Sequence, residues 1–287
     1  MLPRKPETQF VSIQWGNQYN IGMAFSFVHI SDHHLCESEE TLRRGFSPAY
    51  AMRSVMKNIY DQVGPQIDFI VSTGDLVEPA TDAAYQSARK LLGAREEPAI
   101  APGPIYFSSF GFKNFRMVLL PGNHDDRQPY YTSFFHQRSN NPLVNTSFMH
   151  KRVQFVCLDW GSDSKGVAYP ETLSFLERTL ESGNPSLLLM HHHVLPIGSA
   201  WLDNFIPDGI DKFWEILKGK NVLGILSGHV HITYELEKDG IPVMGVRSTA
   251  FPFLLSDESV MVLQPPHYRL VTIDGTKLTS KIFEVPL

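Results

Sequence analysis

The chain has 287 residues, 43% hydrophobic and 19% charged, the balance of an ordinary soluble protein. A formal net charge of −5 argues against a nucleic-acid polymer as partner, and no apolar run approaches the roughly 20 residues of a membrane-spanning helix. The two cysteines are too few for a disulfide framework, and the first 22 residues do not look like a signal peptide, so we expect a cytoplasmic protein without membrane contact.

Short apolar runs that each end in a polar cluster predict buried strands along the chain. Between them, apolar residues recur at helical spacing after a capping residue or a proline, which predicts helices. This alternation of strand and helix indicates an α/β fold with helices covering a sheet. The strands are predicted at 25–30, 67–71, 117–120, 155–158, 187–190 and 222–226, and the helices after Ser47-Pro48, Thr81, Pro170 and Asp208.

The C-terminal quarter differs from the rest in its turn signals. Asp239-Gly240 and Asp274-Gly275 lie between β-prone runs and predict hairpins, and therefore a second, more antiparallel sheet. Residues 94–116 are rich in Pro, Gly and Phe without a period, which predicts a lid or surface loop. We expect residues 1–22 to be an N-terminal extension and residues 23–287 to form a single domain.

Polar clusters follow the predicted strands directly, and eight of the twelve histidines lie in them. In open α/β sheets, ligands bind beyond the carboxyl ends of the strands, so the clusters should converge. Imidazole and carboxylate together suit Zn, Fe and Mn better than Ca or Mg. Seven ligands exceed one tetrahedral site, which predicts two ions sharing a bridging carboxylate; the candidates are Asp32, His34, Asp75, Asn123, His191, His229 and His231.

Such a site has a recognisable chemistry. Two ions about 3.5 to 4 Å apart can hold a water, lower its pKa toward about 7 and clamp both oxygens of an in-line displacement. The sequence therefore predicts hydrolysis of a phosphoester by attack of a metal-bridging hydroxide, without a covalent enzyme intermediate.

The order of the motifs resembles that of the calcineurin-like metallophosphoesterases: Asp32-x-His34, Gly74-Asp75, Gly122-Asn123-His124-Asp125, a strand-end histidine and Gly228-His229-Val230-His231. Within that superfamily the chain is most similar to the class III cyclic nucleotide phosphodiesterases, from Pro121–Arg127 and the hairpin beginning Pro266-His267-Tyr268-Arg269-Leu270. The similarity covers roughly residues 23–287. It implies a four-layer α/β/β/α sandwich of two mixed sheets flanked by helices.

The resemblance also implies roles for single residues. Asp32, His34, Asp75 and His231 would hold one metal, and Asp75, Asn123, His191 and His229 the other, with Asp75 as the bridge. The two ions would be Fe, Mn or Zn, divalent or of mixed valence. His124 would contact the substrate phosphate or protonate the leaving oxygen, and Asp125 would orient the His124 ring.

Some residues depart from the family pattern or admit two interpretations. Relatives usually read His-His-Pro where this chain has His191-His192-His193-Val194; we take His191 as the ligand, with His192 as the alternative. His33 should point away from the metals. Asp159 is interpreted as structural, Arg43 and Arg44 are candidates for a phosphate contact, and Phe110 and Phe112 for stacking on a base.

The leading functional hypothesis is hydrolysis of small phosphodiesters such as cyclic nucleotides or glycerophosphodiesters. A phosphomonoesterase or nucleotide pyrophosphatase would use the same metals and differ only in the pocket. A binding or scaffold protein on the same fold is disfavoured, because the ligand set is complete. The sequence leaves open the substrate, the metals and any self-association.

Overall fold

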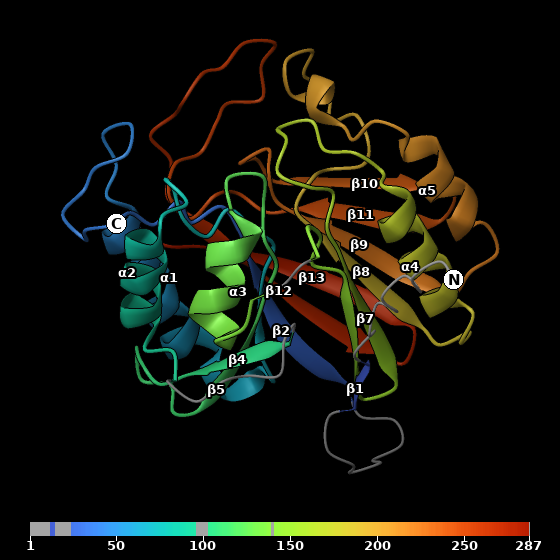
Figure 1. Ribbon diagram of the computed structural model, residues 1–287, viewed down its shortest axis with the longest axis horizontal. Helices are drawn as coiled ribbons and strands as arrows, with labels where there is room; N and C mark the ends of the chain where they lie inside the picture. The colour runs from blue at the N-terminus through green and yellow to red at the C-terminus, as the bar shows by residue number, and fades with distance from the viewer. Residues whose placement is uncertain (1–11, 15–23, 96–102, 139–140, 287) are drawn as a thin grey trace, which may run out of the picture.

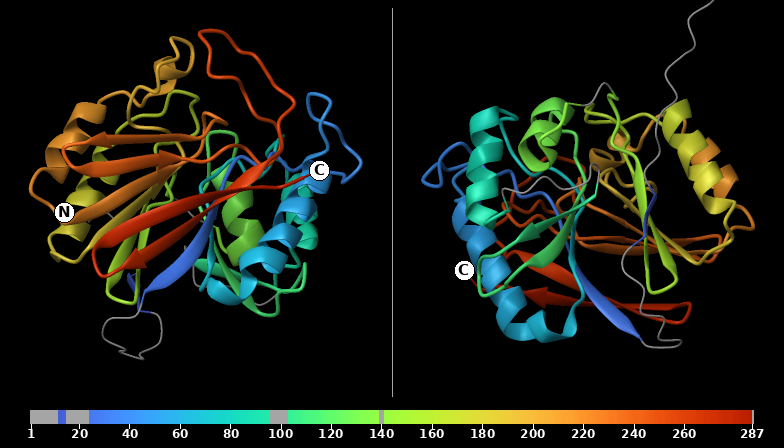
Figure 2. Two further views of the ribbon diagram at one scale, coloured as in Figure 1. Left: turned by 180° about the vertical axis from the view of Figure 1, so that it is seen from behind. Right: turned by 60° about the horizontal axis from the view of Figure 1, so that its bottom comes forward.

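Two mixed β-sheets lie face to face, and helices cover the outer face of each (Figures 1 and 2). The structure is a computed structural model that describes residues 12–14, 24–95, 103–138 and 141–286. The predicted four-layer α/β/β/α sandwich is therefore confirmed. None of the helices in these ranges is long and apolar enough to cross a bilayer.

The first sheet has a parallel centre with antiparallel strands on both sides. Strands β2, β3 and β5 run parallel, β12 and β13 extend the sheet beyond β2, and β4 closes the other edge. In spatial order the strands are β13 (Lys277–Glu284), β12 (His267–Asp274), β2 (Phe25–Ile30), β3 (Ile70–Ser72), β5 (Phe115–Leu119) and β4 (Pro104–Phe107).

The second sheet is parallel from β7 through β8 and β9 to β11, with β6 and β10 antiparallel to their neighbours. Its order is β1 (Ser12–Gln14), β6 (Thr146–His150), β7 (Val153–Leu158), β8 (Ser186–Met190), β9 (Val222–Ser227), β11 (Ile241–Gly245) and β10 (Tyr234–Lys238). Part of the predicted N-terminal extension thus adds strand β1, parallel to β6. The rest of residues 1–22 lies outside the described residues, and the boundary at residue 23 stays a prediction.

Two helices begin with the side-chain caps that the sequence predicts. The Ser47 hydroxyl accepts a hydrogen bond from Tyr50 N at the start of the first helix, and Thr81 caps the second through Ala84 N. Within the described ranges, three helices cover the first sheet and two cover the second. They are α1 (Pro48–Val63), α2 (Asp82–Leu92) and α3 (Arg127–Phe135), then α4 (Pro170–Leu180) and α5 (Ile210–Leu217); short 3₁₀ turns are η1 (Gly64–Gln66) and η2 (Leu202–Phe205).

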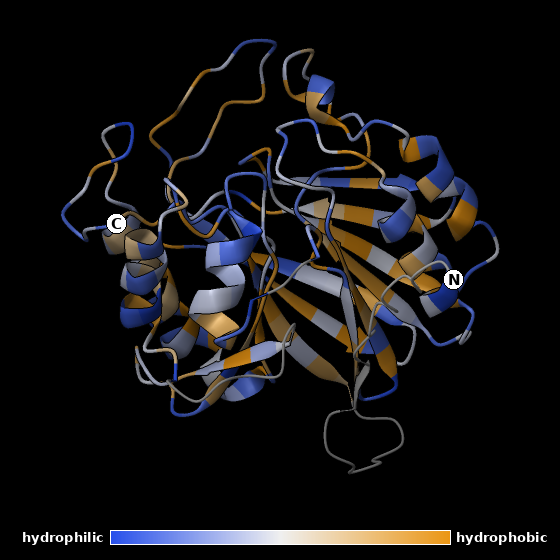
Figure 3. Ribbon diagram, in the orientation of Figure 1, coloured by the Kyte–Doolittle hydropathy of each residue, from blue (hydrophilic) through white to orange (hydrophobic). Residues whose placement is uncertain are grey.

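The core consists of three apolar layers, one between the sheets and one under each set of helices. Between the sheets, the rings of Phe27 and Phe69 stack at 5.1 Å and those of Phe148 and Phe155 at 4.9 Å. Because both faces of the central strands are covered, these strands are apolar along their length, as Figure 3 shows.

Three expectations need correction. Residues 104–107 and 115–119 are paired strands at the sheet edge, and Phe107 and Phe112 are buried, so part of the predicted 94–116 loop is ordered sheet and core; residues 96–102 lie outside the described residues. Asp239-Gly240 is the predicted turn, but the second hairpin turns at Gly275-Thr276, because Asp274 pairs with Lys277. The two hairpins also join different sheets instead of forming a separate one.

Candidate metal centre

The seven candidate ligands come from the carboxyl ends of strands in both sheets. Asp32 and His34 follow β2, Asp75 follows β3, and Asn123 follows β5, all in the first sheet. The second sheet supplies His191 after β8, and His229 and His231 after β9. Parallel strands carry these residues to one end of the sandwich, as the strand-end pattern predicts.

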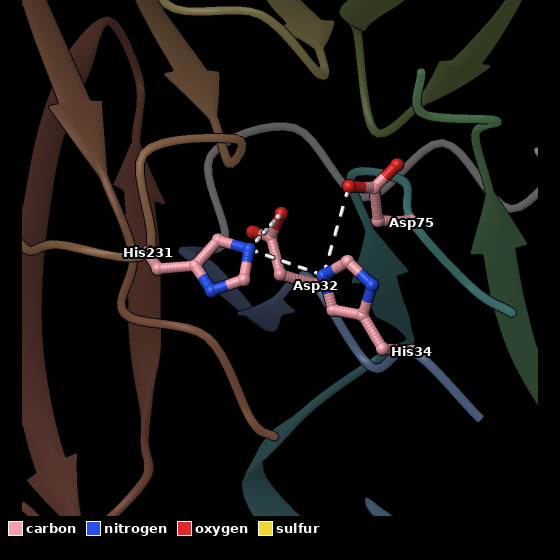
Figure 4. A group of neighbouring side chains, drawn as sticks. All are labelled: Asp32, His34, Asp75 and His231. Atoms are coloured by element: carbon pink, nitrogen blue, oxygen red, sulfur yellow. Dashed lines mark hydrogen bonds and ion pairs between the residues drawn. The ribbon is translucent and has the colours of Figure 1, made fainter. Parts of the chain in front are cut away.

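One group consists of Asp32, His34, Asp75 and His231, whose potential ligand atoms all lie within 4.8 Å of one another (Figure 4). Nε2 of His34 and Nε2 of His231 are 3.1 Å apart. Asp75 Oδ2 lies 3.7 Å from the first of these nitrogens, and Asp32 Oδ1 lies 3.4 Å from the second. All four side chains are buried.

A second group shares the Asp75 carboxylate. Asp75 Oδ2 lies 3.4 Å from Nε2 of His191, and Asn123 Oδ1 lies 3.0 Å from that nitrogen and 3.0 Å from Nδ1 of His229. His192 instead directs Nε2 to the carbonyl oxygen of Asp163, 3.0 Å away. The His192 ring packs 4.5 Å from the ring of His229, but of the two alternatives at the strand end His191 is the one whose ring nitrogen faces Asp75 and Asn123.

Hydrogen bonds fix which nitrogen of two imidazoles carries a lone pair. Nδ1 of His231 lies 2.7 Å from the carbonyl oxygen of Phe251, and Nδ1 of His191 lies 2.8 Å from that of Thr73. Because a carbonyl oxygen only accepts, each Nδ1 donates, and each Nε2 of a neutral ring presents a lone pair toward carboxylate oxygens. Lone pairs converging on carboxylates are the arrangement of a metal site whose outer partners orient the ligands, so the donors fit transition-metal ions.

The pKa values of two candidate ligands, His34 and His229, also suit metal binding. Burial lowers the pKa of His34 to about 3 and that of His229 well below its ordinary value, so both rings are neutral near pH 7, as metal ligation requires. His191 behaves oppositely: although burial opposes its charged form, the Asp75 carboxylate raises its pKa to about 9. The space between His191 and Asp75 thus attracts positive charge.

The backbone at the site is unusual as well. Five of the seven candidate ligands have left-handed backbone, with φ between 45° and 72°: Asp32, His34, Asp75, His229 and His231. Residues other than glycine seldom adopt this conformation, and such residues cluster at functional sites. The backbone of Gly122 also lies very close to the Asp75 side chain: a β-carbon at Gly122 would lie 2.1 Å from Oδ1 of Asp75. Only glycine lets the Asn123 loop come this near.

The structure corrects the role expected of Asp125. Its buried carboxylate accepts hydrogen bonds from Gly122 N, Leu76 N and the Tyr85 hydroxyl, so it ties the Asp75 loop to the Asn123 loop. The acid beside the His124 ring is Glu78, whose Oε1 lies 3.7 Å from Nδ1. Glu78 was not among the site residues predicted from the sequence, and its place three residues after Asp75 was the available signal.

The Glu78 carboxylate lies beside three other side chains. Its Oε2 lies 3.0 Å from Nδ1 of His34, at an angle that does not suit a hydrogen bond, and its Oε1 pairs with Arg43. The Glu78 carboxylate therefore stands between one candidate ligand, a surface cation and His124. The ring of His124 lies 5.2 Å from that of His34.

Other residues singled out in the sequence lie as follows. His33 points away from the ligands, as expected, with Nδ1 2.7 Å from the Thr249 hydroxyl and Nε2 2.8 Å from that of Ser72. Asp159 is structural, since it forms a buried ion pair with Arg127. Phe112 is buried under the helices of the first sheet and Phe110 packs against the same core, so base stacking is not their role.

A cavity of about 150 Å³ opens beside the ligands. Arg44 lines it and places its guanidinium 5.5 Å from the centroid of the Phe251 ring. Many of the other side chains that line the cavity are aromatic, and no sequence motif predicted this. The lining residues are His34, Arg44, Asp75, Glu78, Asn123, His124, Ser164, Trp201, Leu202, Phe205, His229, His231, Phe251 and Phe253.

Comparison with known proteins gives consistent matches. The chain is 26% identical over 282 residues to a 3′,5′-cyclic-nucleotide phosphodiesterase of Nostoc sp., covering 93% of this chain and 95% of that protein. It is 28% identical over 233 residues to the 3′,5′-cyclic adenosine monophosphate phosphodiesterase CpdA of Escherichia coli, covering 79% and 76%. A dimetal phosphatase from Danio rerio has a TM-score of 0.58 at 14% identity, covering 91% of this chain and 99% of that chain, which shows the shared fold.

The family model for calcineurin-like phosphoesterases matches residues 25–233, which include all seven candidate ligands. The chain therefore belongs to the calcineurin-like phosphoesterase family and is a phosphoric ester hydrolase.

Proposed function

We propose that this protein is a dinuclear metal-dependent phosphodiesterase that hydrolyses small phosphodiesters, cyclic nucleotides among them. The observation that carries the proposal is the Asp75 carboxylate, whose Oδ2 lies near ligand nitrogens of both groups, 3.7 Å from His34 and 3.4 Å from His191. The Nostoc and Escherichia coli relatives, both named for cyclic nucleotides, support this choice of substrate.

Each group of ligands suits one ion. Asp32, His34, Asp75 and His231 would hold the first, and Asp75, Asn123, His191 and His229 the second. Mixed imidazole and oxygen donors favour Fe, Mn or Zn. Such a pair supplies an activated water and neutralises charge on a phosphate.

His124 is the residue placed to handle the leaving group. It lines the cavity, and its side chain is 41% exposed, so a substrate can reach it. Glu78 lies beside Nδ1, which leaves Nε2 for the departing ester oxygen. Donation of a proton there lets a poor alkoxide leave as an alcohol.

The cavity offers a phosphate few side-chain cations. Of the described residues that line it, Arg44 is the one lysine or arginine. A phosphomonoester carries about −1.5 to −2 near pH 7, whereas a diester carries a single negative charge. One cation beside the metals therefore suits the diester.

Metal-free protein reconstituted with Mn, Fe or Zn tests the proposal. The panel consists of cyclic nucleotides, glycerophosphodiesters, bis-p-nitrophenyl phosphate and p-nitrophenyl phosphate. We expect close to two ions per chain by elemental analysis and a higher kcat/KM for diesters. A higher kcat/KM for p-nitrophenyl phosphate than for every diester would favour the monoesterase, and one ion at most would refute the dinuclear site.

A further inference from the structure

One side of the cavity consists of aromatic rings instead of polar side chains. Trp201 and Phe253 contact each other edge to face with ring centroids 5.1 Å apart, and Trp201 and Phe205 meet similarly at 6.1 Å. All three side chains are only partly buried, so their rings remain open to a ligand. We call these three residues the aromatic wall.

The three residues of the aromatic wall come from two segments that are joined by hydrogen bonds. The 199–206 segment carries Trp201 and Phe205, and the 251–263 segment carries Phe253; both extend at the same end of the molecule in Figures 1 and 2. The Ser199 hydroxyl donates a hydrogen bond to the carbonyl oxygen of Ser256, and Ala200 N donates to Asp257 Oδ1 at 2.8 Å. These bonds hold the rings in place before a ligand arrives.

The wall lies directly against the candidate ligands. The Phe205 ring is 5.8 Å from the ring of His229, and the Phe253 ring is 4.9 Å from that of His231. A phosphate at the metal centre would therefore bring its ester substituent into contact with the wall.

We infer that the aromatic wall is a subsite for a planar aromatic ring of the substrate, a nucleobase, bound by stacking; the inference rests on the proposed phosphodiesterase function. Aromatic faces and edges are the surfaces on which a planar ring stacks, and here they line the cavity beside the candidate ligands. Ser164 is the one described hydroxyl side chain in the lining. Among the three side chains of the wall, only the Trp201 indole carries a hydrogen-bonding group, so the wall should accept adenine and guanine alike.

Replacing Trp201 tests the subsite by comparing substrates. Trp201→Ala should lower kcat/KM for 3′,5′-cyclic AMP and cyclic GMP by about 5- to 100-fold, mainly through KM, because base stacking on an aromatic ring has this strength. Glycerophosphoethanolamine, a diester without a ring, should be affected by less than about 2-fold, the effect expected where stacking is absent. Trp201→Phe should restore most of the loss.

Tyr50→Ala is the matched control, since Tyr50 is an exposed aromatic residue on α1 that does not line the cavity. It should behave as the wild type. Thermal unfolding monitored by circular dichroism checks that Trp201→Ala is folded. An equal loss on all three diesters in the folded variant would overturn the subsite while leaving the phosphodiesterase proposal intact.

A binding measurement separates the inference from the proposed function. Adenosine 5′-monophosphate should quench the tryptophan fluorescence of a Trp15→Phe protein, and adding Trp201→Phe should abolish the quench, because of the tryptophans that the structure describes Trp201 lines the cavity, whereas Trp160 and Trp214 are buried. A quench in a protein that hydrolyses no diester would support the subsite and refute the function. Hydrolysis of cyclic nucleotides with the same quench in Trp201→Phe would refute the subsite alone.

Discussion

The two sides of the cavity are built differently. The ligand side consists mostly of buried side chains at strand ends, and five of these residues hold left-handed backbone. The aromatic wall opposite consists of partly buried rings on connecting segments. Chemistry at a phosphate requires fixed atomic positions, which the sheets supply, whereas contact with the rest of a substrate requires only a complementary surface, which loops can provide. Substitutions on the ligand side should therefore lower the metal content or kcat, whereas substitutions in the aromatic wall should chiefly raise KM.

The largest effect should follow removal of the shared carboxylate. Asp75→Ala should lose both ions together and activity on every substrate, because Asp75 belongs to both groups. His34→Ala should lose chiefly one ion. Elemental analysis measures both, with Asp163→Ala, an exposed acid near the cavity, as control. Equal metal loss in Asp75→Ala and His34→Ala would contradict the bridge.

A second prediction tests whether His124 protonates the leaving group or binds the phosphate. His124→Ala should retain both ions and lose about 10²- to 10⁴-fold in kcat on cyclic AMP, whose ribose oxygen leaves poorly, because general acid help has this size. The loss on bis-p-nitrophenyl phosphate should be distinctly smaller, since p-nitrophenolate needs little protonation. A uniform loss would assign His124 to phosphate binding, and lost metal would make it a ligand.

Glu78 should have an intermediate effect. Glu78→Gln keeps the shape of the side chain but removes the charge beside Nδ1 of His34 and of His124. We expect about a 10- to 100-fold loss in kcat for cyclic AMP, the size usual for groups that orient ligands. The ratio of adenine to guanine substrates should not change. Glu39→Gln, which breaks a surface ion pair with Arg53, is the control. Wild-type rates in Glu78→Gln would exclude this role.

The smallest effect concerns histidines behind the ligands. Burial lowers the pKa of His33 and His193 to about 4 and that of His267 to about 3, below the ordinary value of 6.5. The unfolded chain therefore binds more protons below pH 6.5, and each histidine should reduce the free energy of unfolding by up to about 1.4 kcal/mol per pH unit between pH 6.5 and 4. Urea unfolding of metal-free protein at pH 7 and 5 measures this, and an unchanged midpoint would disprove it.

The sequence predicted those elements whose cause is local. Ser47-Pro48 and Thr81 open helices through hydrogen bonds within one turn, and the strands before Asp32 and Asp75 are apolar on both faces. Helix α3 was missed because its nine residues are fewer than the roughly 11 to 18 over which a helical period is recognised, although Tyr130, Tyr131, Phe134 and Phe135 share one face of it. Strand β4 was missed because only pairing with β5 defines this four-residue edge.

The same distinction applies to the site. The candidate ligands follow strand ends, so the pattern of the sequence alone brought them together. Trp201 and Phe253 meet through hydrogen bonds between two loops, and Glu78 reaches His124 through the Asp125 contacts that tie two loops. Trp201 and Phe253 are far apart in the sequence, and the place of Glu78 three residues after Asp75 does not by itself show that it reaches His124, so tertiary structure was needed to find both contacts.

Each ligand group takes members from both sheets, and this has a mechanical consequence. Asp32, His34, Asp75 and Asn123 follow strands of one sheet, and His191, His229 and His231 follow strands of the other. An ion bound in either group would cross-link the two sheets at the end of the sandwich where the ligand loops follow the carboxyl ends of the strands. Removing the ions with a chelator would break this cross-link. Amide hydrogen exchange should then accelerate at the carboxyl ends of β2, β3, β8 and β9 together, in both sheets at once.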